Sequence, residues 1–141
     1  MDYETVPAPD FGHALRGLSL NFLVRDVGLE AGFLRAVLGF GVHRMSADFA
    51  ILTVQGQPLQ LHSDAAYASH PLPALLPEAG ARGAGIELRL HEVDPDAACA
   101  RAAVFEGAMV LQAAVDKPAH GLREAVILSP HRYAWVPSRR I

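Results

Sequence analysis

Two segments of the chain share one pattern of apolar and polar positions. Apolar residues occupy every second position from Leu18 to Val24, with Ser19, Asn21 and Arg25 on the other side, which predicts a strand with one apolar face and one mixed face. Asp26 follows as the cap of a predicted helix, whose apolar residues recur at helical spacing until Gly39, a usual C-terminal stop. After this helix the pattern predicts short strands around residues 41–44, 49–54 and 58–62.

The same order of elements recurs later in the chain. Residues 86–91 alternate again, and Asp94, with Pro95 in the first turn, caps a predicted helix that runs to Gly107. The spacing between the copies is constant at 68 residues, as in the pairs Leu20 and Leu88, Asp26 and Asp94, Gly39 and Gly107, and Val42 and Val110. The sequence therefore predicts an internal repeat of two strand-helix-strand-strand-strand modules, neither of which buries its sheet alone.

These modules define the expected organisation of the chain. We expect an N-terminal arm over residues 1–15, a first module over 16–62, a linker over 63–84 and a second module over 85–141, within one domain overall. The arm holds acidic residues and two prolines without an apolar stretch, so we expect it to be loose and not a signal peptide.

Composition excludes several classes of partner. The chain has 141 residues and a net charge of -3, with no basic block that would bind phosphate backbones, so nucleic acid is not an expected partner. No run approaches the roughly 18 apolar residues of a membrane span. The mean hydropathy of +0.19 favours a second subunit that covers apolar surface. Cys99 alone excludes a disulfide framework and suits a cytoplasmic location.

Particular stretches resemble a known superfamily. Residues 20–26, Leu-Asn-Phe-Leu-Val-Arg-Asp, and 32–40, Gly-Phe-Leu-Arg-Ala-Val-Leu-Gly-Phe, are similar to the first module of the vicinal oxygen chelate superfamily, which includes glyoxalases, extradiol dioxygenases and bleomycin-resistance proteins. Residues 122–136 resemble its closing hairpin. The resemblance implies an α+β fold, in which two repeated βαβββ modules form a curled mixed sheet around a cleft, commonly completed in a homodimer. It indicates fold more than function, because this scaffold hosts many chemistries.

Metal-dependent members of the superfamily bind their ion on the cleft faces of the first and last strands of each module. The resemblance places Ser19 and Gln60 at these positions in the first module, and Glu87 and Val136 in the second. Valine cannot ligate, whereas a catalytic site normally has three histidine, carboxylate or thiolate donors. We therefore expect no metal cofactor. The alternative is a divalent metal ion at a shifted site formed by His62, Glu87 and His91.

The predicted cleft faces suit a small apolar or anionic molecule held by a few hydrogen bonds. Strand alternation turns Tyr133 and Trp135 toward the helices or a partner subunit, and Ala134 into the cleft. An anion would be held by Arg89, unless that guanidinium neutralises Glu87 on the same strand face. The expected ligand-binding residues are Asn21, Gln60, His62, Glu87, Arg89 and Val136.

The leading functional hypothesis is a metal-free small-molecule-binding protein, similar to the bleomycin-resistance branch, that acts by sequestration. Whether the chain is an enzyme is left open by the sequence. The alternatives are a metal-dependent lyase or dioxygenase at the shifted site, a metal-free isomerase with Glu87 or Glu124 as its base, and an interaction module whose cleft is filled by side chains. The linker from Tyr67 to Leu76, with His70, is a candidate lid over the cleft.

Overall fold

Two compact units make up the chain. The computed structural model describes residues 1–141, apart from the side chain of Ala84. One unit contains Met1–Ala31 and Phe40–Leu75, and the other contains Gly32–Gly39 and Leu76–Ile141. Each unit holds a four-stranded mixed sheet, which confirms the predicted α+β fold with two βαβββ modules. None of the helices described has the length and apolar character of a membrane span.

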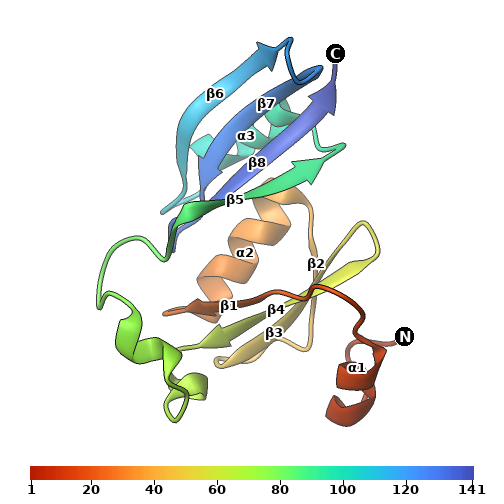
Figure 1. Ribbon diagram of the computed structural model, residues 1–141, viewed down its shortest axis with the longest axis vertical. Helices are drawn as coiled ribbons and strands as arrows, with labels where there is room; N and C mark the ends of the chain where they lie inside the picture. The colour runs from red at the N-terminus through yellow and green to blue at the C-terminus, as the bar shows by residue number, and fades with distance from the viewer. The chain divides into compact units, whose positions relative to one another are not determined.

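The first unit begins with a short helix and continues into the first sheet. Its strands are ordered β1-β4-β3-β2, with β1 parallel to β4 and the other pairs antiparallel (Figure 1). The elements from α1 to η2 are α1 (Ala8–Ala14), β1 (Asn21–Val24), α2 (Val27–Leu38), β2 (Gly41–His43), β3 (Phe49–Val54), β4 (Gln57–Ser63) and the 3-10 helices η1 (Ala65–Tyr67) and η2 (Leu72–Leu75). The predicted linker is thus helical in two short stretches. Most of α2, from Gly32 on, is assigned to the second unit.

The start of α2 follows the predicted capping chemistry. Asp26 Oδ1 accepts a hydrogen bond from the backbone N–H of Leu29 at 3.0 Å, which satisfies one of the free donors of the first turn. The strand before it is shorter than predicted. It begins at Asn21, and Leu18, expected on the apolar face, is 89% exposed. The chain leaves the arm through Gly17 at a φ of 62°, a left-handed turn that interrupts the extended backbone.

The N-terminal arm is packed, which corrects the expectation that it is loose. Val6 and Phe11 form a buried cluster with Ile51 of β3, and Tyr3, Leu15 and Phe49 are partly buried against it. Tyr3 and Phe11 meet edge to face, with ring centroids 6.0 Å apart. Prolines and acidic residues are interspersed among these apolar residues, and for this reason the arm was expected to be loose.

The second unit repeats the same topology. Its strands are ordered β5-β8-β7-β6, with β5 parallel to β8. The elements are β5 (Gly83–His91), α3 (Pro95–Ala103), β6 (Met109–Lys117), β7 (Leu122–Leu128) and β8 (Tyr133–Arg140). Arg89 lies opposite Val136 as Asn21 lies opposite Gln60, so the strand pairing is repeated. The spacing of 68 residues holds between Asn21 and Arg89 but not for the last strand, because the second module is longer before β8.

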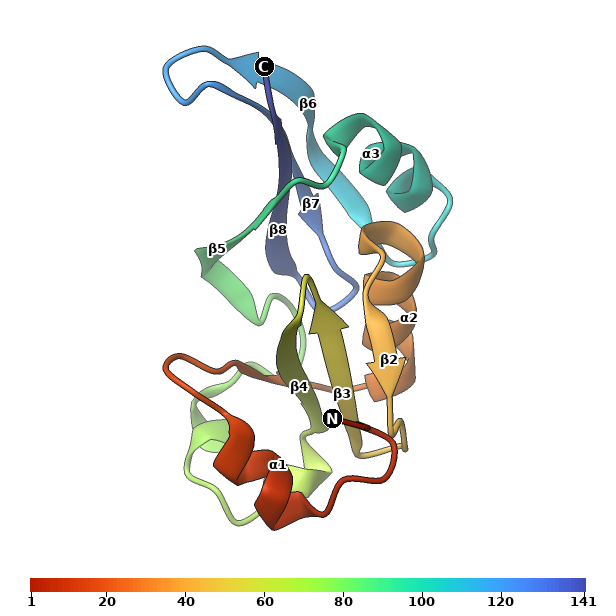
Figure 2. The ribbon, with the colours of Figure 1, turned by 90° about the vertical axis from the view of Figure 1, so that its right-hand side faces the viewer.

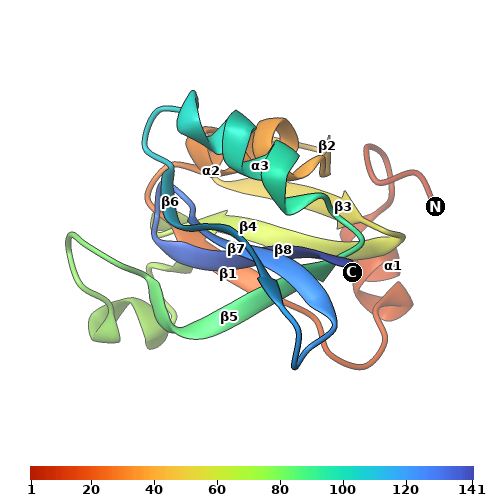
Figure 3. The same ribbon diagram turned by 90° about the horizontal axis from the view of Figure 1, so that it is seen from above.

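One face of the second sheet is covered by α3 (Figures 2 and 3). Leu88, Trp135 and Ile127 are paired across β5, β8 and β7, and all three are buried, as strand alternation predicts for Trp135. The helix ends at Ala103 and not at Gly107, because a turn through Phe105 follows it. The Phe105 ring meets the edge of Phe33, with centroids 5.9 Å apart.

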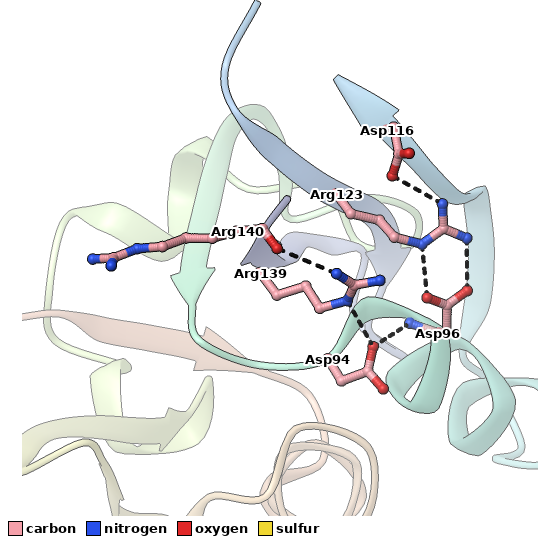
Figure 4. Close-up of polar contacts among 6 residues, drawn as sticks. All are labelled: Asp94, Asp96, Asp116, Arg123, Arg139 and Arg140. Atoms are coloured by element: carbon pink, nitrogen blue, oxygen red, sulfur yellow. Dashed lines mark hydrogen bonds and ion pairs between the residues drawn. The ribbon is translucent and has the colours of Figure 1, made fainter. Parts of the chain in front are cut away.

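Ion pairs fasten the beginning of α3 to its sheet (Figure 4). Arg123 on β7 donates to both carboxylate oxygens of Asp96, at 2.8 and 2.9 Å, and to Asp116 on β6 at 3.1 Å. The hydrogen bonds from Arg123 hold the pKa of Asp96 below its ordinary value. Asp94 caps the helix as predicted, since its Oδ1 accepts from the backbone N–H of Asp96 at 3.2 Å.

We expect Arg123→Ala to lower the melting temperature by a few degrees in low salt, because it removes a bidentate pair that joins α3 to β7. The difference from wild type should shrink in 1 M NaCl, where exposed charges are screened. Arg140→Ala is the matched control, since that side chain points away from the cluster in Figure 4. A loss of equal size at both salt concentrations would contradict an electrostatic role.

Candidate functional site

Strand register gathers the predicted ligand-binding residues of the first module on one face of its sheet. Residues paired directly across a sheet share a face. One such row runs through Asn21, Gln60, Ile51 and His43, and the next runs through Leu23, His62 and Phe49. The alternate residues on these strands form the opposite, buried face: Phe22, Val24, Ala50, Leu52 and Leu61.

The first-unit site, as we define it, consists of Asn21, Phe49, Gln60, His62 and Tyr67. The ring of His62 contacts two aromatic rings, with centroids 5.1 Å from Phe49 and 4.9 Å from Tyr67. Its Nε2 is 3.3 Å from Gln60 Oε1, and Asn21 Nδ2 donates to the Tyr67 hydroxyl at 3.2 Å. The site therefore combines aromatic surface with uncharged hydrogen-bonding groups.

Tyr67 is held over the sheet by the turn that follows β4. Ser63 Oγ donates to Asp48 Oδ1 at 2.6 Å and accepts from the backbone N–H of Ala66 at 3.2 Å, which fixes the start of η1. The ring of His70 lies 4.9 Å from that of Tyr67. Sequence reasoning placed these two residues in a candidate lid but did not identify Tyr67 as a site residue. The lid itself stays a prediction.

Burial sets the charge of His62. Its side chain is half-buried among aromatic rings, and the loss of hydration lowers its pKa below the ordinary value of 6.5. His62 is therefore neutral at pH 7, so that its ring presents one donor and one acceptor nitrogen.

The second-unit site, defined by Glu87, Arg89, His120, Glu124 and Val136, is charged instead. Arg89 on β5 donates to Glu87 at 2.9 Å and reaches Glu124 on β7 with its other terminal nitrogen. His120 Nδ1 lies 3.7 Å from the same Glu124 oxygen. The guanidinium is thus shared between two carboxylates.

Arg89 reaches Glu124 by crossing the central strand β8. Arg89 is paired with Val136, and Glu124 is paired with Ser138, so the ion pair extends over both of these β8 residues. Val136 is 1% exposed and Ser138 is fully buried. His91, at the end of β5, has its Nδ1 3.3 Å from Ser138 Oγ. Ala134 shares this face through its pairing with Glu87.

The pKa of Glu124 bears on its predicted role as a base. Burial raises the pKa of this carboxyl, but the hydrogen bond and charge of Arg89, aided by His120, outweigh burial and leave it below its ordinary value. The bond to Glu124 also raises the pKa of Arg89. A carboxylate held in this way is a weak proton acceptor at neutral pH, which argues against Glu124 as a general base.

The predicted metal donors are divided between the units. His62 belongs to the first unit, whereas Glu87 and His91 belong to the second, so the shifted site stays a prediction. Among the side chains that the structure describes, no three histidine, cysteine, aspartate or glutamate residues form a group that could hold a metal ion. Ser19 lies outside β1 and is exposed.

Comparison with known proteins identifies the fold. No protein-family model and no curated protein matches the chain. Among solved structures, it is similar to a glyoxalase/bleomycin resistance protein/dioxygenase family enzyme from Burkholderia phytofirmans PsJN, with a TM-score of 0.67 and 20% identity over 87% of this chain and 97% of that chain. A glyoxalase-related enzyme from Fulvimarina pelagi matches with a TM-score of 0.68 and 14% identity over 89% of each chain.

A third similar structure is a glyoxalase/bleomycin resistance protein/dioxygenase from Nocardioides, with a TM-score of 0.64 and 18% identity over 93% of this chain and 89% of that chain. The chain therefore has the fold of the glyoxalase/bleomycin resistance/dioxygenase proteins, as its resemblance to the vicinal oxygen chelate superfamily implies. At these sequence identities the similarity defines the fold alone, and the function has to be inferred from the residues of the site.

The lowered pKa of His62 predicts a pH-dependent stability. The stabilisation is fully present above about pH 6.5, the pKa of histidine in the unfolded chain. It is lost as the pH falls from there through the lower pKa of the folded state, because between these two pKa values only the unfolded chain binds the proton. Between pH 7 and pH 5, His62→Gln should therefore lose less unfolding free energy than wild type. Urea unfolding at both pH values measures this difference, with His13→Gln, at an exposed position, as the control. Equal losses in His62→Gln and wild type would contradict the assignment.

A double-mutant cycle tests the ion pair in the second unit. Arg89→Ala should lower the unfolding free energy by about 1–3 kcal/mol, because the buried Glu124 loses its cation. The added substitution Glu124→Gln should recover part of this loss, and Glu87→Gln, an exposed control, should cost no more than about 1 kcal/mol. If the losses of unfolding free energy in Arg89→Ala and Glu124→Gln add up to the loss in the double variant, the two side chains are not coupled.

Proposed function

We propose that this protein binds a small, neutral aromatic molecule at the first-unit site and acts by sequestration, without a resident metal. The observation that carries this proposal is the cluster of aromatic rings around His62, joined to the amides of Asn21 and Gln60. Stacking surface with a few uncharged hydrogen-bonding groups is the chemistry of a site for a mostly apolar ligand.

The electrostatics of the two sites favour a neutral ligand over an anionic one. Burial keeps His62 uncharged at neutral pH, so the first-unit site offers no cation from this ring. In the second unit, Arg89 is already shared between Glu87 and Glu124, and an anion would have to replace these carboxylates. The sequence suggested an apolar or an anionic ligand, and these charges favour the apolar, neutral one.

An enzyme with a metal cofactor is the alternative. It is supported by the solved structures of similar fold, which include a family enzyme from Burkholderia phytofirmans and a glyoxalase-related enzyme from Fulvimarina pelagi. The neutral imidazole of His62 is also the form that binds metal ions. In this alternative, His62 would act with Glu87 and His91, as the sequence suggests.

The homodimer is a further part of the proposal. Edge strand β6 exposes apolar side chains at Met109, Leu111 and Val115, which are 45%, 61% and 38% exposed. Apolar surface at a sheet edge is commonly covered by a partner. Sedimentation at several protein concentrations would separate a dimer from a monomer.

Binding is tested with a thermal-shift screen of neutral bicyclic aromatics such as 1-naphthol, followed by titration calorimetry on the hits. We expect stoichiometric binding without a product, and a melting temperature that rises with ligand concentration. His62→Ala should weaken binding about tenfold or more, because it removes the ring that contacts both Phe49 and Tyr67. Glu87→Gln, in the second unit, is the matched control and should leave the affinity nearly unchanged.

Elemental analysis of natively purified protein separates the two hypotheses. Near-stoichiometric zinc, iron, manganese or nickel that is lost in His62→Ala or Glu87→Gln would favour the enzyme and overturn sequestration. A screen in which no compound raises the melting temperature would also contradict the proposal and favour an interaction module.

A further inference from the structure

The N-terminal arm lies on the same face of the first sheet as the proposed ligand site. The row through Asn21, Gln60, Ile51 and His43 crosses all four strands of this face. Its first two residues belong to the ligand site, whereas Ile51 is buried in the cluster with Val6 and Phe11 of the arm. The arm therefore covers one half of the face and leaves the other half to the site.

Phe49 connects the two halves. Its side chain is partly buried against the arm cluster, and its ring lies 5.1 Å from the ring of His62. An aromatic ligand that stacks beside His62 and extends along β3 would meet the apolar surface that Phe11 now covers. That surface already accepts a phenyl ring, so its chemistry suits a second aromatic group of the same size.

The arm is held by its apolar cluster and by a small set of polar contacts. Helix α1 has seven residues and no side-chain cap at its N-terminus, so it is short for a helix that must be stable without tertiary support. Polar contacts to the sheet come from Glu4, which accepts from the backbone N–H of Arg44 at 3.0 Å and lies 3.8 Å from His43 Nδ1. Open pockets of about 430 and 260 Å³ border the arm, beside Leu15 and Pro58.

The repeat provides an internal comparison. In the second unit, the position equivalent to Ile51 is Val126 on β7, next to Ile127, and Val126 is half-buried. Ile51, in contrast, is fully buried. The additional burial of Ile51 is therefore due to the arm, for which the second unit has no counterpart.

We propose that the arm, residues 1–16, is an intramolecular occupant of an apolar binding surface centred on Ile51 and Phe49, and that an aromatic ligand displaces it. The identity of the displacing ligand rests on the proposed function, whereas the opening of the arm is independent of it. The apparent affinity of the surface is then the intrinsic affinity reduced by the fraction of molecules whose arm is open. Anything that loosens the arm strengthens binding.

Amide exchange measured by NMR on the full chain, with and without 1-naphthol, tests the proposal. We expect the amides of Val6, Phe11 and Arg44 to exchange faster than those of the β3–β4 ladder, because the arm opens without global unfolding. Adding 1-naphthol should speed the exchange of the arm amides further and shift the signals of Ile51. Faster exchange on ligand addition identifies displacement, whereas a lid that closes over the ligand would slow it.

Two variants loosen the arm without changing the sheet. Phe11→Ser should speed exchange of the arm amides about tenfold or more and tighten 1-naphthol binding by a similar factor. Glu4→Ala removes only the contacts to β2 and the residue after it, and should produce a smaller change in the same direction. Leu18→Ser is the matched control, because Leu18 is 89% exposed and lies between the arm and β1.

The outcomes separate this inference from the proposed function. Binding of 1-naphthol to Phe11→Ser that shifts Ile51 but not His62 supports the arm as occupant and contradicts the first-unit ligand site. Three results would each overturn the inference. The arm amides could exchange only together with those of the β3–β4 ladder, or 1-naphthol could slow their exchange or leave it unchanged. The third is that Phe11→Ser does not bind 1-naphthol at Ile51.

Discussion

The parallel pairing of the first and last strands of each module determines which side chains can act together. β1 and β4, like β5 and β8, are far apart in sequence, and the hydrogen bonds between them fix the register across each sheet. A shift of one residue would turn Asn21 or Arg89 into the buried face. A parallel neighbour also requires a crossover connection, which the helix of each module provides. Both candidate sites depend on this pairing.

The same pairing supports different chemistry in the two units. Asn21 and Arg89 occupy equivalent positions, but the first contacts an uncharged tyrosine hydroxyl and the second bridges two carboxylates. The residue opposite each differs as well, since Gln60 contacts a histidine ring while Val136 is covered by an ion pair. The first face is therefore neutral and aromatic, and the second is charged and internally compensated. One duplicated scaffold thus presents unlike surfaces.

The sequence predicts what is local and periodic. The alternation of 86–91, the caps at Asp26 and Asp94 and the repeat spacing predicted two modules, and the resemblance to the vicinal oxygen chelate superfamily implied the fold. Strand alternation placed Asn21, Gln60 and His62 on one face. Tyr67 and the bond from Arg89 to Glu124 could not be predicted in this way. The first depends on a turn held by Ser63, and the second on two strands brought together across a third. The packing of the arm depends on an apolar surface that only the assembled sheet presents.

Both faces are occupied by groups of the chain itself, and this constrains what they bind. Arg89 and Glu124 cover Val136, so a ligand there must separate a partly desolvated ion pair before it gains any contact. On the first face the group that covers the sheet is the apolar side of the N-terminal arm. An apolar ligand that replaces it restores the buried apolar contact and leaves no charge uncompensated. The face to which a ligand binds is therefore determined by the group of the chain that the ligand must displace there. An uncharged aromatic molecule meets the smaller cost on the first face, where burial has already made the central histidine neutral.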